Sequence, residues 1–211
     1  AQALGKGPVK GLARFHPRIL ISHQARAPSL IPTPVVLYHA HICCTVGEPI
    51  TLTRDHMAKN LLISGCSTGI GRACALHFAK NGYRVFACVR KQSDADSLAA
   101  ADGSGNLEPM MLDVTDVAQL DALKAELDEK IGTQGLAGLI NNAGVARGGP
   151  LEYIDPQIVR DVFNVNLMGP LLLTQAFLPL IKVAGGRVIT IGSIAGKVAS
   201  PMMGPYCISK F

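Results

Sequence analysis

The sequence lacks the cysteine patterns that mark a metal-binding protein. Its six cysteines form no C-x-x-C pair, and none has the spacing to histidine that a zinc site requires. Four of them lie inside apolar helix or strand patterns, where cysteine is usually a small core residue. We therefore expect a reduced protein of the cytoplasm that has no metal site.

Residues 58–211 also lack an excess of positive or negative charge, and they lack a long apolar run. Residues 1–57 carry six Lys/Arg and two Asp/Glu, whereas residues 58–211 carry fourteen and thirteen, so the second part is almost neutral. A near-neutral domain gives no electrostatic reason to bind nucleic acid. The longest apolar runs are much shorter than the roughly 20 residues that span a bilayer, so we expect no transmembrane span.

Residues 1–57 show no sustained helical or alternating periodicity. They hold six of the thirteen prolines and five of the six histidines. We expect a disordered extension, or translated sequence upstream of a true start at Met57. A transit peptide is the alternative, but the prolines break any long amphipathic helix.

Residues 58–211 alternate between strand and helix patterns, as one α/β domain does. The expected strands are 60–64, 83–89, 107–112, 136–140 and 187–191. The expected helices are 70–81, one capped by Thr115, one opened by Asp155 and Pro156, and one that begins near Met203. Residues 91–106 are expected to form a loop or a short helix. Short, nearly all-apolar strands indicate a doubly wound, Rossmann-like parallel sheet, whose ligand crevice lies at the carboxyl ends of the strands.

A glycine-rich turn joins the first of these strands to the first helix. Residues 64–71 read Ser-Gly-Cys-Ser-Thr-Gly-Ile-Gly, with the glycines in the pattern G-x-x-x-G-x-G. Such a turn lets a pyrophosphate approach the backbone and the N-terminus of the helix. It is not a Walker P-loop, because no Gly-Lys-Ser/Thr follows. Glycines also occur at strand-to-helix turns that bind nothing, so the turn alone leaves both interpretations open.

The end of the second expected strand lacks the acidic residue that binds the ribose hydroxyls of NAD. Val89 occupies that position, and Arg90 and Lys91 follow it. A cation there can pair with the 2′-phosphate of NADP. The sequence therefore favours NADP, with a solvated basic loop as the alternative.

The last residues of the chain place Tyr206 and Lys210 four positions apart, on one face of the expected helix. A tyrosine beside an ammonium can exchange a proton with an alcohol oxygen while a hydride moves at the carbon. Ser193 ends the fifth expected strand, where it can polarise a substrate oxygen. A serine hydrolase is disfavoured, because the motif is G-S-x-x-G rather than G-x-S-x-G and the domain has one histidine, His77.

Polar residues mark two further strand ends and one apolar helix. Asn142 follows the fourth expected strand, and Asp113 follows the third. The asparagine can tie adjacent strands together, and the carboxylate can accept a hydrogen bond from an adenine. Both residues also have an ordinary interpretation as turn residues. Asn166 lies within an apolar helix, where a buried amide needs partners, and this suggests a role.

In this order, the motifs resemble those of the short-chain dehydrogenase/reductase family. The resemblance covers residues 59–211 and rests on Gly65-x-x-x-Gly69-Ile70-Gly71, Asp113, Asn141-Asn142-Ala143-Gly144, Asn166, Ser193 and Tyr206-x-x-x-Lys210. It implies an oxidoreductase that transfers a hydride between NADP(H), favoured over NAD(H), and an alcohol or a ketone.

The resemblance also implies a role for each site residue. Ser193 would position the carbonyl, Tyr206 would be the acid/base, and Lys210 would favour its phenolate and bind the nicotinamide ribose. Asn166 would hold a water that continues a proton relay through Lys210. Cofactor contacts are expected from Gly65, Ser67, Thr68, Gly69, Ile70, Gly71, Arg90, Asp113, Val114, Asn142, Ala143, Gly144, Tyr206 and Lys210, with Asp113 at the adenine.

The residues around Ser193 and Tyr206 are similar to those of hydroxysteroid and retinol dehydrogenases, which implies a lipophilic substrate. Family members continue well beyond the lysine, with further strands, a substrate loop and much of the subunit interface. We therefore expect the C-terminal strands to be missing from this chain and the full-length form to be a homo-oligomer. The alternative is a catalytically incompetent fragment that at most binds the nucleotide cofactor. The substrate and the direction of the reaction stay open.

Overall fold

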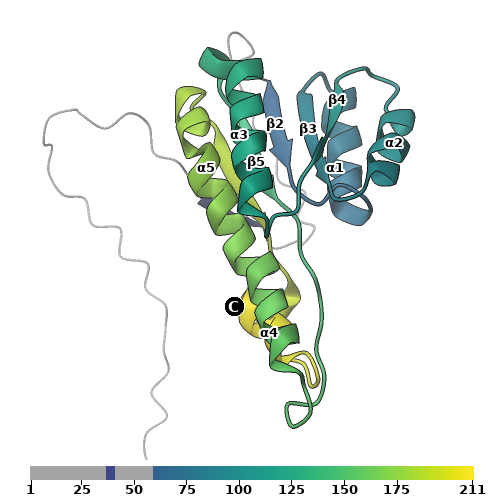
Figure 1. The fold of residues 1–211 in the computed structure, drawn as a ribbon, viewed down its shortest axis with the longest axis vertical. Coiled ribbons are helices and arrows are strands. Elements are labelled where there is room, and N and C mark those ends of the chain that lie inside the picture. The colour runs from purple at the N-terminus through teal and green to yellow at the C-terminus, as the bar shows by residue number, and fades with distance from the viewer. Residues whose placement is uncertain (1–36, 41–58) are drawn as a thin grey trace, which may run out of the picture. The chain divides into compact units, whose positions relative to one another are not determined.

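Residues 37–40 and 59–211 are described by a computed structural model, which is built around one parallel β-sheet (Figure 1). Its strands are β1 (Leu37–Ala40), β2 (Asn60–Ile63), β3 (Arg84–Val89), β4 (Leu107–Met111), β5 (Gly138–Asn141) and β6 (Arg187–Ile191). They lie in the order β1-β6-β5-β2-β3-β4, and all neighbours are parallel. The chain thus runs outward from β2 to β4 and returns to the other side of β2, which confirms the predicted doubly wound fold.

Six α-helices connect or follow these strands. They are α1 (Gly69–Lys80), α2 (Gln92–Ala101), α3 (Val117–Ile131), α4 (Pro156–Phe163), α5 (Gly169–Val183) and α6 (Gly204–Lys210). The five expected strands are present within two residues of their expected bounds, and the stretch left as loop or short helix contains α2. The expected cap of α3 is wrong by one residue: the side chain of Asp116, not Thr115, accepts a hydrogen bond from the backbone of Gln119.

Successive residues of β2 and of β3 pack into different cores on the two faces of the sheet. Leu62 and Phe86 are buried in one core together with residues of α3 and α5. Ile63 and Val85 are buried in the other core together with residues of α1 and α2. Figure 1 shows α3 and α5 side by side across one face. Burial on both faces explains why the strands are apolar at nearly every position.

A π-helix, η2 (Asn164–Met168), joins α4 and α5 into one continuous helical run. Within the described residues, this run, Pro156–Val183, is the single stretch long and apolar enough to cross a membrane by length and composition. The prediction of no transmembrane span considered only uninterrupted apolar runs and overlooked it. Leu173 and Phe177 of α5 are buried against the sheet, which is the arrangement of a core helix.

The N-terminal prediction falls almost entirely outside the described residues. Only Leu37–Ala40 of residues 1–57 is described, and it pairs with β6 from Val188 to Ile191. The sequence did not predict this strand, because four residues are too few to show a period.

Candidate functional site

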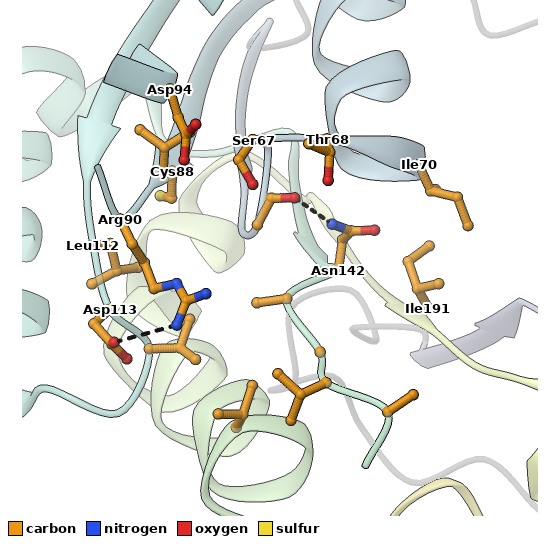
Figure 2. Close-up of a pocket in the computed structure, with 18 of the residues that line it drawn as sticks. Ser67, Thr68, Ile70, Cys88, Arg90, Asp94, Leu112, Asp113, Asn142 and Ile191 are labelled. Carbon is orange, nitrogen blue, oxygen red and sulfur yellow. Dashed lines mark hydrogen bonds and ion pairs between the residues drawn. The ribbon is translucent and has the colours of Figure 1, made fainter. Parts of the chain in front are cut away.

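A cavity of about 460 Å³ lies at the carboxyl ends of the strands, where the doubly wound fold places its ligand crevice (Figure 2). The predicted site residues that line it are Gly65, Ser67, Thr68, Ile70, Arg90, Asp113, Val114, Asn142, Ala143, Gly144, Tyr206 and Lys210. Four other predicted residues are not among its lining: Gly69, Gly71, Asn166 and Ser193. The fold thus brings residues from both ends of the domain to one space.

The glycine-rich turn needs its glycines for two reasons. Gly65 and Gly69 have φ angles of 71° and 59°, in the left-handed region that favours glycine. A Cβ on Gly71 would collide with the carbonyl oxygen of Gly65 and the side-chain amide of Asn142. Gly71 therefore allows the start of α1 to lie directly against the turn and the loop after β5.

Asn142 fastens this turn to the neighbouring strand. Its side-chain amide donates hydrogen bonds to the carbonyl oxygens of Ser64, at 2.9 Å, and Gly65, at 2.8 Å. The Ser64 hydroxyl in turn accepts hydrogen bonds of 3.0 Å from the backbone N–H groups of Asn142 and Ala143. The strand-bridging role was predicted for the asparagine from the sequence, but not for Ser64, a buried hydroxyl directly after an apolar strand.

The start of α1 has the geometry that a pyrophosphate requires. Among the described residues, no side chain caps this helix, and the helix has no acidic residue in its first turn. Its first N–H groups therefore have no competing side-chain acceptor from the helix, and Thr68 and Ile70 at its start line the cavity. Ser67 and Thr68 add two hydroxyls on the turn above Asn142 (Figure 2). The residues present fit the phosphates of a dinucleotide cofactor.

The ends of β3 and β4 place a cation beside a carboxylate. Arg90 Nη1 lies 3.9 Å from Asp113 Oδ2 (Figure 2). The other oxygen of Asp113 accepts hydrogen bonds from the Thr115 backbone N–H, at 2.9 Å, and the Thr115 hydroxyl, at 2.7 Å. Partial burial raises the pKa of Asp113, but the hydrogen bonds from Thr115 and the charge of Arg90 outweigh it and hold the pKa below its ordinary value.

Tyr206 and Lys210 lie on α6. They line the same cavity as the glycine-rich turn, although more than 130 residues separate them from it in the sequence. The Lys210 ammonium donates a hydrogen bond of 2.9 Å to the carbonyl oxygen of Ile191, the last residue of β6. It lies 6.0 Å from the centre of the Tyr206 ring. Burial lowers the pKa of Lys210 below its ordinary value, because it disfavours the charged form.

Asn166 is buried in η2, and its side chain joins two other segments. Its oxygen accepts a hydrogen bond from the backbone N–H of Val145, at 2.8 Å. Its amide donates to the Val145 carbonyl oxygen and to the Ser209 hydroxyl, each at 2.9 Å. π-Helices occur frequently at functional sites. The buried Asn166 amide thus has hydrogen-bond partners for its oxygen and its nitrogen. A water-mediated proton relay from Asn166 through Lys210 stays a prediction.

Ser193 lies two residues after the end of β6 and precedes the short 3₁₀ turn Ile194–Gly196 as its N-cap. Its hydroxyl oxygen accepts a hydrogen bond of 3.1 Å from the backbone N–H of Ala195. Gly192, the preceding residue, lines the cavity. Ser193 therefore stands at the edge of the cavity, with its hydroxyl proton available for another oxygen.

Val89 and Lys91, which the sequence places with Arg90 at the end of the second expected strand, also line the cavity. No role was predicted from the sequence for eight other residues of its wall: Cys88, Asp94, Leu112, Val145, Ala146, Val165, Ile191 and Gly192. Most of them flank predicted residues and contribute through position in the sheet rather than through a motif. Asp94 is the exception, since it adds a second carboxylate to the cavity wall from the first turn of α2.

Comparisons with known proteins agree with this geometry. The family model described as short chain dehydrogenase matches residues 59–211. Retinol dehydrogenase 5 of Homo sapiens is 40% identical over 152 residues, which are 72% of this chain and 47% of that protein. Mitochondrial D-beta-hydroxybutyrate dehydrogenase of Bos taurus is 37% identical over 161 residues, 73% of this chain and 46% of that protein. The chain spans about half the length of these curated relatives.

Solved structures show the same likeness. A short-chain dehydrogenase from Streptomyces avermitilis superposes with a TM-score of 0.67 and 32% identity, over 72% of this chain and 56% of that one. A gluconate 5-dehydrogenase from Burkholderia cenocepacia, in complex with NADP and tartrate, superposes with a TM-score of 0.66 and 29% identity, over 73% of this chain and 61% of that one.

Proposed function

The chain belongs to the short-chain dehydrogenase/reductase family, and from its site we propose that it transfers a hydride between NADP(H) and an alcohol or a ketone. One observation carries the proposal: Tyr206 and Lys210 line the same cavity as the glycine-rich turn. A proton donor and a phosphate-binding turn thus share one space, as a cofactor-dependent alcohol or ketone reaction requires.

In this proposal, the phenol of Tyr206 moves the proton of the reaction. As a phenolate it takes the proton from the hydroxyl when an alcohol is oxidised, and as a phenol it gives its proton to the oxygen when a ketone is reduced. The bound nicotinamide supplies or accepts the hydride at the carbon. The Lys210 ammonium stands near the Tyr206 ring and stabilises negative charge on the phenol oxygen while the proton is away.

Three other residues prepare the site in this proposal. The Ile191 carbonyl holds Lys210 by a hydrogen bond, which leaves two ammonium protons for the ribose of the nicotinamide. Ser193 donates its hydroxyl proton to the substrate oxygen and polarises it. Asn166 fixes the loop at Val145 and the helix at Ser209, so the tyrosine and the lysine keep their positions.

We propose NADP(H) as the preferred cofactor because Arg90 and Lys91 line the cavity after β3. A guanidinium can bind a 2′-phosphate by two parallel hydrogen bonds. The NADP in the Burkholderia cenocepacia neighbour supports this proposal. A lipophilic alcohol as substrate is supported by the retinol dehydrogenase relatives. Cytoplasmic location and homo-oligomer formation stay predictions from the sequence.

Substitution of Tyr206 by Phe tests the proposal. We expect the rate of NADPH oxidation with a panel of lipophilic ketones to fall by a factor of about one hundred or more, because the proton donor is lost. NADPH binding, measured by calorimetry, should persist. Tyr153→Phe is the matched control, since Tyr153 is exposed and lies outside the cavity lining.

Two results would contradict the proposal. Full activity of Tyr206→Phe would show that another group moves the proton. NADPH binding by the unaltered chain without turnover of any ketone would instead support a protein that only binds the nucleotide.

A further inference from the structure

The part of the cavity near the ends of β3 and β4 carries charges of both signs. Arg90 and Lys91 line it, but so do the carboxylates of Asp94 and Asp113 (Figure 2). A pocket that binds only a phosphate-bearing cofactor would be expected to concentrate cations. Whatever contact Asp113 makes with the adenine, its charge also acts on the cations beside it.

The contact between Arg90 and Asp113 is electrostatic and not a hydrogen bond. The 3.9 Å between Nη1 and Oδ2 exceeds the 2.7–3.2 Å of a hydrogen bond. Asp113 thus does not orient the fork of the guanidinium, but its charge attracts the guanidinium and lowers the positive potential around it.

Asp113 itself is held in place and kept ionised. The backbone and the hydroxyl of Thr115 both bind its Oδ1, so the carboxylate cannot turn away from the cavity without losing two hydrogen bonds. The same contacts hold its pKa below the ordinary value, so the group is negative throughout the neutral range.

A fixed negative charge acts differently on the two nicotinamide cofactors. The 2′-phosphate of NADP is an anion that must approach Arg90, and Asp113 both repels this phosphate and competes for the guanidinium. The 2′-hydroxyl of NAD has no charge, so its binding is almost indifferent to Asp113. The adenine is common to both cofactors, and any contact with it cancels when their affinities are compared.

We propose that Asp113 is a specificity-determining residue, whose negative charge beside Arg90 weakens the binding of the 2′-phosphate and narrows the preference for NADP(H) over NAD(H). The inference rests on the proposed function, since it concerns the same cofactor cavity. Asp113 thus counteracts the preference for NADP(H) that the charge of Arg90 produces.

Calorimetric titration of the chain with NADP⁺ and with NAD⁺ tests this inference in wild type and in Asp113→Asn. The asparagine keeps an oxygen that can accept the Thr115 hydrogen bonds, so the loop should keep its shape. We expect the ratio of the NAD⁺ to the NADP⁺ dissociation constant to rise by about two- to fivefold, the range for a partly exposed charge pair. The increase should shrink at high salt, because ions screen the interaction.

Glu129→Gln is the matched control, since it removes one negative charge from an exposed position in the last turn of α3, outside the cavity. Its ratio of dissociation constants should equal that of wild type. An unchanged or lower ratio in Asp113→Asn, with normal binding by wild type, would overturn this inference alone. Binding of neither cofactor by wild type would overturn the proposed function, and the inference with it.

Discussion

The side-chain amide of Asn166 donates a hydrogen bond of 2.9 Å to the hydroxyl of Ser209. The Ser209 hydroxyl in turn donates a hydrogen bond of 2.8 Å to the backbone carbonyl oxygen of Tyr206. The π-helix in the middle of the long helical run is thus joined to α6, which carries Tyr206 and Lys210.

Substitution of Ser209 by Ala should break this link. The buried amide of Asn166 then loses an acceptor, and we expect the free energy of unfolding to fall by about 1–3 kcal/mol. In the proposed reaction, kcat should fall more than KM rises, because the link positions Tyr206 and Lys210. Urea unfolding and steady-state kinetics measure the two effects. Ile208→Ala, an exposed neighbour on α6, is the control, and equal behaviour of the two variants would contradict the prediction.

Substitution of Gly71 by Ala should damage the glycine-rich turn. The new methyl group would collide with the Gly65 carbonyl and the Asn142 amide, and backbone cannot yield as a flexible side chain does. We expect a loss of about 1–3 kcal/mol in the free energy of unfolding and weaker NADP⁺ binding by calorimetry. Gly103→Ala is the control, since open space surrounds that exposed glycine. A stable Gly71→Ala chain that binds normally would show that the turn tolerates the methyl group.

The lowered pKa of Lys210 predicts a pH dependence of stability. In the unfolded chain this amine titrates near its ordinary value of 10.5, whereas in the folded chain it titrates lower. Between the two values the unfolded state binds more protons, so the free energy of unfolding should rise with pH through this window. Lys210→Met lacks the titrating group. The stability of wild type relative to Lys210→Met should therefore increase from neutral pH toward pH 10.5, as urea unfolding can measure. A difference that stays constant or decreases would contradict the lowered pKa.

Much of the fold could be predicted because burial on both faces makes the strands apolar at nearly every position. The run Tyr83–Val89 contains β3 with one extra residue at its start. The helix α2 was left undecided because only Ala95 and Leu98 are buried, which is too weak a pattern to read as a face. The π-helix has no sequence signature, since nothing in a 3.6-residue period marks one extra residue in a turn.

The site was less predictable than the fold, because its contacts join distant segments. The motifs identified Arg90 and Asp113 separately, each with its own role toward the cofactor. That the two lie 3.9 Å apart follows only from the pairing of β3 with β4. In the same way, nothing near Asn166 in the sequence indicates that Val145 is its partner. Local sequence patterns identify single candidate residues, whereas the order and pairing of the strands determine which of these residues lie in contact.

The hydrogen bonds between Asn142 and the glycine-rich turn join positions 78 and 77 residues apart in the chain. A ribosome that has just released the turn must still synthesise the rest of α1 and then β3, α2, β4, α3 and β5 before Asn142 emerges. Contacts of such long sequence separation form late, after the loop between them has been ordered. The nascent chain therefore carries the glycine-rich turn without its hydrogen bonds to Asn142 until that residue has been synthesised, and only then can the turn be fixed against the loop after β5.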